Sequence, residues 1–87
     1  MKVINMTSNK GNKTANQFVI EGNNGLTFQS YTSAIAFKPL RGKIQLDREK
    51  WDYSVTTGKF RNIFLGEKKT ETEKKIKSGE YILTNLN

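Results

Sequence analysis

The segment Trp51–Leu65 holds the densest set of side chains that could do chemistry: aromatic rings, hydroxyl groups and two bases around the expected start of a helix. A helix N-terminus presents free N–H groups and a positive dipole, which favour phosphate. The hydroxyl and basic groups could hold a nucleic-acid backbone there, and the rings could stack on a base. The residues concerned are Trp51, Tyr53, Thr56, Thr57, Lys59 and Arg61.

A role in folding alone explains the same residues. Trp51 and Tyr53 could anchor the core, and Ser54 could cap the helix. Lys59 and Arg61 lie roughly 200° apart around a helix, on either side of its apolar stripe. The two bases therefore do not form one basic strip, and both interpretations stay open.

A second set of candidates follows from the segment Gly42–Trp51, which reads Gly-Lys-Ile-Gln-Leu-Asp-x-Glu-x-Trp. It resembles the passage from the last strand to the helix in the single-stranded-DNA-binding coactivator fold, a curved antiparallel sheet followed by a helix. The resemblance implies that four side chains face nucleic acid: Tyr31, Phe37, Arg41 and Lys43. A generic amphipathic strand and turn explains the same segment.

The composition excludes several kinds of catalysis. The chain has no Cys and no His, so thiol nucleophiles, the usual zinc ligands and Ser-His or Cys-His pairs are ruled out. Asp47, Glu49 and Asp52 could bind Mg²⁺, but Arg48 and Lys50 alternate with them, which favours ion pairs on the surface. We therefore expect no catalytic residue, no metal site and no cofactor, and we do not expect an enzyme.

A longer resemblance covers residues 17–65. The run Trp-Asp-Tyr-Ser-x-Thr-Thr-x-Lys at Trp51–Lys59 is similar to one in small proteins of tailed bacteriophages. In those proteins a Phe/Tyr-Ser-Tyr-x-Ser-x-Ile-Ala stretch lies upstream, and Phe28–Ala36 stands in that place here. The resemblance implies a phage origin but no activity. Phe60 stands where some relatives have His, so no role of an imidazole carries over.

The charge of the chain points to an anionic partner. Fifteen Lys and Arg against eight Asp and Glu give a net charge of +7, which attracts polyanions. No stretch approaches the roughly 18 apolar residues that span a bilayer, and the N-terminus has no apolar run of signal-peptide length. We expect a protein of the host cell cytoplasm with no membrane contact.

Alternating apolar residues predict the strands that must position these groups. Short strands are expected at Lys2–Met6, Gln17–Glu21 and Lys43–Asp47, with a loop at Thr7–Asn12. Asn24-Gly25 predicts a hairpin. Leu26–Phe37 changes the face of its apolar residues midway, which predicts a bulge or short turn within Gln29–Ser33. Pro39 should end that strand.

Two helices are expected. The first should run from about Val55 to Leu65, with a cap at Ser54 or Thr56 and a stop at Gly66. Its buried stripe is expected at Phe60, Ile63 and Phe64. The second should run over Thr70–Ser78, opened by a capping box between Thr70 and Glu73. Glu80–Asn87 could return as an edge strand.

The elements together predict an α+β fold in one domain of residues 1–87. It comprises a small antiparallel sheet of three to five strands, one packed helix and a short C-terminal helix. Residues 1–16 form a polar N-terminal segment, 17–65 the core sheet and helix, and 67–87 the C-terminal helix and edge strand. The expected core residues are Phe18, Ile20, Phe28, Ile35, Ile44, Leu46, Trp51, Phe60, Ile63 and Phe64.

Three functions fit this sequence. The first is a non-enzymatic phage protein that binds nucleic acid through backbone electrostatics and aromatic stacking, with Arg41, Lys43, Lys59 and Arg61 as the main contacts. The second is an effector that binds and inhibits a host enzyme or defence complex. The third is an assembly component that forms homo-oligomers through an unpaired edge strand.

Overall fold

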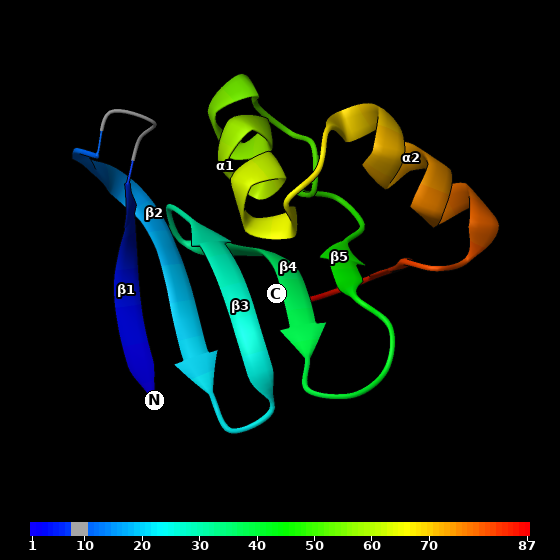
Figure 1. Cartoon of the computed structure of the whole chain (residues 1–87), viewed down its shortest axis with the longest axis horizontal. Coiled ribbons are helices and arrows are strands. Elements are labelled where there is room, and N and C mark those ends of the chain that lie inside the picture. The colour runs from blue at the N-terminus through cyan, green and yellow to red at the C-terminus, as the bar shows by residue number, and fades with distance from the viewer. Residues whose placement is uncertain (8–10) are drawn as a thin grey trace.

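The computed structural model describes residues 1–7 and 11–87 and shows a six-stranded sheet with two helices (Figure 1). The strands are β1 (Lys2–Thr7), β2 (Lys13–Gly22), β3 (Gly25–Ser30), β4 (Ser33–Pro39), β5 (Gln45–Asp47) and β6 (Ile82–Thr84). The helices are α1 (Val55–Leu65) and α2 (Lys69–Ser78). The α+β class is confirmed. The loop predicted at Thr7–Asn12 falls largely on residues 8–10, which lie outside the described residues.

The sheet is larger and less regular than the sequence predicts. Its strands lie in chain order, and neighbours are antiparallel except for β5 and β6, which are parallel. The predicted range of three to five strands is wrong because Leu26–Phe37, expected as one interrupted strand, divides into β3 and β4, and part of the C-terminal segment pairs as β6. The purely antiparallel sheet is also wrong: α1 and α2 carry the chain back across the sheet, and such a crossover makes the next strand parallel.

The hairpin predicted at Asn24-Gly25 is present, between β2 and β3. Gly22 pairs with Gly25, so the first turn consists of Asn23 and Asn24, one residue earlier than expected. Gly25 has a φ of +147°, and a Cβ there would lie 2.1 Å from the Lys38 carbonyl oxygen. Only glycine therefore fits where the turn meets β4.

The predicted change of face in Leu26–Phe37 is confirmed. β3 ends at Ser30, β4 begins at Ser33, and the pairing register shifts between Phe28 and Gln29. The extra residue in β4 lets both Phe28 and Ile35 be fully buried. Pro39 is the last residue of β4, as expected.

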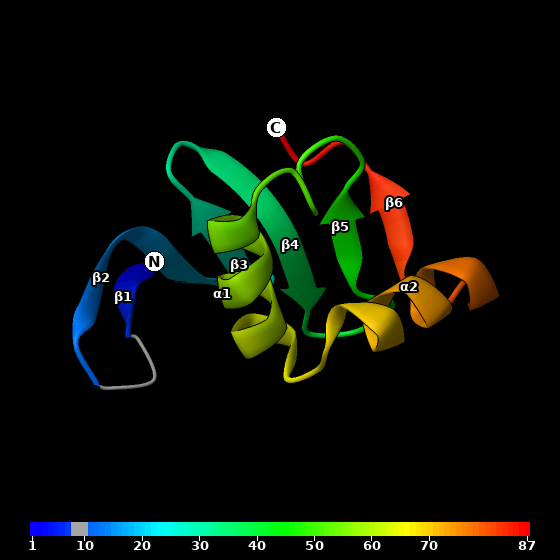
Figure 2. The same cartoon turned by 90° about the horizontal axis from the view of Figure 1, so that it is seen from above.

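α1 has the predicted bounds and caps. The Ser54 hydroxyl accepts from the Thr57 N–H at 3.1 Å, and Gly66 ends the helix in the left-handed conformation. Phe60 and Phe64 are buried, and the Phe64 ring lies 5.8 Å from that of Phe28. Ile63 is 44% exposed, so its predicted core position is wrong. The helix packs on β3 and β4, while β1 and β2 lie to one side of it (Figure 2).

α2 is confirmed as a helix, but its capping box is wrong. The helix follows Lys68, and no side chain caps its first turn. Thr72 instead donates its hydroxyl to Glu67 at 2.7 Å. Neither α1 nor α2 is long and apolar enough to cross a bilayer, and the described residues contain no further helix.

The core lies between the helices and one side of the sheet. Its buried residues are Met6, Phe28, Ile35, Ala36, Leu46, Phe60, Phe64 and Tyr81, and Ile44 and Trp51 pack against them. The predicted core positions of Phe18 and Ile20 are wrong. β2 instead turns Val19 toward the core, because Val19 pairs with Phe28 beneath α1. Both helices lie on this side of the sheet (Figure 2), and the opposite side carries neither.

Candidate functional site

One uncharged row of side chains crosses the side of the sheet that carries no helix. Paired residues of neighbouring strands project from the same face. The row therefore follows the pairing from β1 to β6: Val3, Ile20, Thr27, Phe37, Gln45 and Ile82. Its two ends, Val3 and Ile82, are 59% and 43% exposed, and the four residues between them are partly buried. We call this side the helix-free face.

A second aromatic ring and further amides lie on the same face. Side chains alternate along a strand, so Phe18 projects on the same side as Ile20. Phe18 pairs with Gln29 of β3 and with Asn5 of β1. The helix-free face thus carries two phenylalanine rings, a hydroxyl and several amide groups.

Two cations border the helix-free face. Ile44 and Leu46 pack into the core, so alternation directs Lys43 to the other side, beside Gln45. The Leu40 N–H donates to the Asn24 carbonyl at 2.9 Å, which fixes the loop before β5 against the turn between β2 and β3. Arg41 is the next residue in this loop. Both Arg41 and Lys43 are exposed.

Arg61 lies in the interior, 1% exposed. Its Nη1 donates to the Trp51 carbonyl at 2.8 Å and to Asp52 at 3.1 Å, and its Nη2 donates to Asn62 at 2.9 Å. The guanidinium also lies 5.1 Å from the centre of the Trp51 ring. Arg61 and Trp51 therefore hold the entry of α1 in place and do not present a free cation and ring to a ligand.

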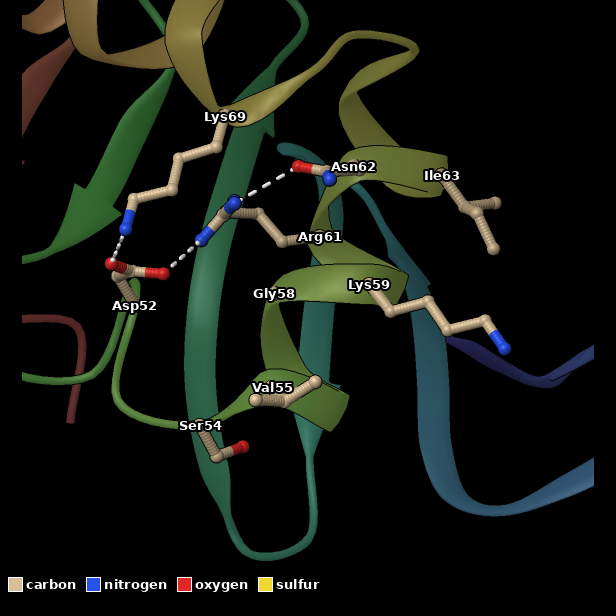
Figure 3. A pocket seen from close by; sticks show the side chains of 9 residues that line it. All are labelled: Asp52, Ser54, Val55, Gly58, Lys59, Arg61, Asn62, Ile63 and Lys69. Atoms are coloured by element: carbon tan, nitrogen blue, oxygen red, sulfur yellow. Dashed lines mark hydrogen bonds and ion pairs between the residues drawn. The ribbon is translucent and has the colours of Figure 1, made fainter.

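A shallow pocket of about 540 Å³ opens beside α1 (Figure 3). Asp52 lies between two cations there, with Lys69 at 2.6 Å and Arg61 at 3.1 Å. Burial raises the pKa of Asp52, but the hydrogen bonds and charges of Lys69 and Arg61 outweigh burial and hold the pKa below its ordinary value. The carboxylate is thus ionised and neutralised by its partners, which makes it a poor general base.

The remaining predicted residues surround the first turn of α1. Tyr53 and Thr56 are exposed, and the Lys50 ammonium lies 5.1 Å from the centre of the Tyr53 ring. Thr57 is fully buried, and its hydroxyl pairs with that of Ser30 at 2.9 Å. Because Ser30 ends β3, this bond brings the exposed Tyr31 to the same end of the molecule. Lys59 is exposed and lies beside the pocket.

The predicted site residues do not form one surface. Arg41 and Lys43 lie beyond one end of β4, and Tyr31 lies beyond the other. A strand of seven residues spans about 20 Å, so one nucleotide cannot bridge the two groups. Thr57 and Arg61 are interior and cannot contact a ligand without unfolding of this region.

The acidic residues between β5 and α1 are structural. Asp47 is 3% exposed and accepts from the N–H groups of Lys50 at 2.9 Å and Leu86 at 2.8 Å. Burial raises the pKa of Asp47, but these hydrogen bonds hold it below its ordinary value. The expected ion pairs of Arg48 and Lys50 with these acids are not among those formed by the described residues, and no group of acids there has metal-binding geometry.

The sequence analysis missed Phe18 and Ile20 as surface residues. Phe18, Val19 and Ile20 are consecutive apolar residues, so both faces of this strand carry an apolar side chain. Alternation alone could not show which face is buried. The Asn23–Asn24 turn sets the pairing that brings Val19 opposite Phe28. Pairing the residues on either side of this turn puts Val19 opposite Phe28, which would have predicted that Val19 faces the core.

The comparisons with known proteins give a family but no activity. A model of a family of unknown function (DUF8033) matches residues 1–80. This range includes β1 to β5 and both helices. No curated protein and no solved structure matches the chain significantly.

Proposed function

The chain belongs to this family of unknown function, and we propose that it binds single-stranded nucleic acid across the helix-free face without catalysing a reaction. One observation supports this proposal most directly. The helix-free face is uncharged along its central row, carries Phe18 and Phe37, and is bordered by Arg41 and Lys43. On such a face, bases would contact the uncharged row and phosphates would contact the cations at its border.

The chemistry of the face favours unpaired bases. Bases are flat and uncharged, so they stack on aromatic rings and form hydrogen bonds with neutral polar groups. Phe18 and Phe37 supply rings, while Thr27 and Gln45 supply a hydroxyl and an amide. A duplex turns its phosphates outward and would leave the apolar part of this face without a partner.

The phosphates would meet cations that the fold has not used. Among the described residues, the ion pairs involve Arg61, Lys69 and Lys75 only. Arg41 and Lys43 are exposed at the border of the face. Lys59 on α1 and Lys74 and Lys77 on α2 lie on the helix side of the sheet, so they add long-range attraction rather than a second contact surface.

A salt series with an oligonucleotide of eight deoxythymidines tests the proposal. Six strands span about 24 Å, which an octanucleotide can cross. Arg41 and Lys43 can each neutralise one phosphate, so the logarithm of the affinity should fall against that of the salt concentration with a slope of about −1.4. Absence of binding at 50 mM salt, or tighter binding of a duplex of equal length, would contradict the proposal.

Charge variants supply the control. Replacing both Arg41 and Lys43 with Gln should weaken binding and make the slope shallower by about 1.4, or 0.7 for each lost phosphate contact. Replacing both Lys74 and Lys77 on α2 with Gln removes the same net charge from exposed positions away from the face. That pair should leave the slope unchanged.

A protein-binding phage effector is the second candidate. The two edge strands β1 and β6 favour it, because an unpaired strand edge can pair with another chain, and each edge carries an exposed apolar residue, Val3 or Ile82. Pull-down from nuclease-treated host lysate distinguishes the two. A stoichiometric host protein that remains bound and competes with the oligonucleotide supports the effector. Loss of every partner with the nucleic acid supports the first proposal.

A further inference from the structure

A hollow of about 210 Å³ lies on the helix-free face, beside the turn between β2 and β3. Ile20, Thr27 and Phe37 line it as three consecutive positions of the cross-strand row. Asn23 and Asn24 of the turn lie at its end, and the N-terminal residue Met1, which is 98% exposed, also lines it. No Asp, Glu, Lys or Arg side chain lines the hollow, although the chain carries 23 such residues.

The size of the hollow suits one flat ring system. Drug-sized ligands usually occupy pockets of roughly 300–1,000 Å³, so a whole ligand of that kind would not fit. Neighbouring strands are about 4.8 Å apart, which puts Ile20 and Phe37 about 10 Å apart with Thr27 between them. A planar ring can therefore lie over Thr27 with apolar contact on both sides.

The turn offers hydrogen bonds at the edge of such a ring. Asn23 and Asn24 are exposed, and an asparagine amide can form two hydrogen bonds with the edge of an adenine base. The backbone beneath them is fixed from two directions. Gly25 packs against the Lys38 carbonyl where no Cβ fits, and Asn24 accepts from the Leu40 N–H at 2.9 Å.

A cation lies beside the same turn. Arg41 directly follows Leu40, and consecutive Cα atoms are about 3.8 Å apart, so its backbone is held close to the hollow. Arginine forms paired hydrogen bonds with phosphate. The apolar hollow with amides at one end suits the base of a nucleotide, and the nearby arginine suits its phosphate.

We propose that the hollow binds one unpaired nucleobase, adenine best, while Arg41 contacts the adjoining phosphate. This inference rests on the proposed function and adds a fixed point at which a bound single strand is held in register. The rest of the helix-free face then contacts neighbouring bases with little preference.

Titration of the ¹⁵N-labelled protein with adenosine 5′-monophosphate tests the inference. The amide signals of Asn23 to Thr27 and of Phe37 should shift in a saturable manner. Asn24→Ala should weaken binding at least about fivefold, because it removes the amide but keeps the backbone carbonyl that Leu40 uses. Asn12→Ala, at an exposed asparagine outside the face, is the matched control and should bind as the parent does.

Arg41→Gln tests the phosphate contact separately from the base contact. It should weaken binding of adenosine 5′-monophosphate and leave binding of adenosine unchanged. Thr27→Gln fills the space over which the ring would lie and should weaken both ligands to a similar extent. These two variants keep the test valid if Asn24→Ala disturbs the turn.

The failures of the two proposals are distinguishable. If the octanucleotide binds but adenosine 5′-monophosphate shifts no amide signal of the hollow, the proposed base site in the hollow is refuted and the proposed function stands. Shifts confined to the pocket beside α1 would also refute the base site. If neither ligand binds at 50 mM salt, both proposals fall.

Discussion

Tyr31 occupies a backbone conformation that a bulky side chain rarely adopts. It is the first of the two residues that connect β3 to β4, its φ is +56°, and its ring is 49% exposed. The left-handed conformation costs an L-residue roughly 1–2 kcal/mol, and glycine avoids most of this cost. The ring of Tyr31 is therefore held in the solvent at the expense of stability.

Tyr31→Gly should raise the free energy of unfolding by about 0.5–1 kcal/mol, which is the relieved strain less the extra entropy of an unfolded glycine. Tyr53→Gly is the matched control: Tyr53 is 44% exposed and its φ is not positive. That variant should lower the free energy of unfolding. Urea denaturation of both proteins measures the difference, and equal losses would show that Tyr31 carries no strain.

Tyr81 joins α2 to the core through Glu67. Its hydroxyl donates to Glu67 Oε1 at 2.6 Å, and Lys75 reaches the same oxygen at 2.9 Å. Burial and the neighbouring carboxylate raise the pKa of Tyr81 to about 12. Burial also raises the pKa of Glu67, but the hydrogen bonds from Tyr81, Lys75 and Thr72 hold it below its ordinary value.

The stability contributed by Tyr81 should therefore depend on alkaline pH. An unfolded tyrosine has a pKa near 10, below the folded value of about 12. The contribution is fully present below pH 10 and is lost as the pH rises to 12. Tyr81→Phe should remove this component of the curve of unfolding free energy against pH. An unchanged loss between pH 10 and 12 in that variant would assign the effect to the lysines.

At the scale of elements, α1 is the part of the fold that the sequence specifies best. Its cap at Ser54, its apolar residues and the stop at Gly66 all lie within the segment itself, so local rules suffice to place it. β2 is the opposite case. Phe18, Val19 and Ile20 are all apolar, so which of them faces the core depends on the pairing of β2 with β3, whose Phe28 packs against Phe64.

Two neighbouring residues of α1 should differ sharply on truncation. Phe64→Ala removes a buried ring that contacts Phe28 and should cost about 3–5 kcal/mol of unfolding free energy. Ile63→Ala removes a side chain that is 44% exposed and should cost less than about 1.5 kcal/mol. Thermal unfolding of the two variants provides the comparison. Similar losses would mean that α1 is rotated from its described position.

The candidate site was only partly predictable, for a similar reason. Arg61 looked like a free base because its burial depends on Asp52 and Trp51, which approach it only when the chain enters α1. Lys43 and Gln45 were correctly separated from Ile44 and Leu46, since that strand alternates cleanly between polar and apolar residues. The pairing of five further strands with that one, which creates the helix-free face, is long-range information.

At the scale of the whole molecule, the two faces of the sheet differ in what covers them. One face packs against α1 and α2 and supplies the hydrophobic core. The other keeps an uncharged row open from β1 to β6, with Arg41 and Lys43 at its border. Under the proposed function, the net charge of +7 would bring a polyanion close, and the uncharged face would select strands whose bases are free.

Mapping the amide shifts of the labelled protein with the octanucleotide tests this account most directly. We expect the shifts to follow the helix-free face, at Phe18, Ile20, Thr27, Phe37 and Gln45, together with Arg41 and Lys43. The signals of α1 and α2 should stay in place. Shifts that instead follow the cations of α2 and the first turn of α1, with none on the helix-free face, would contradict the account.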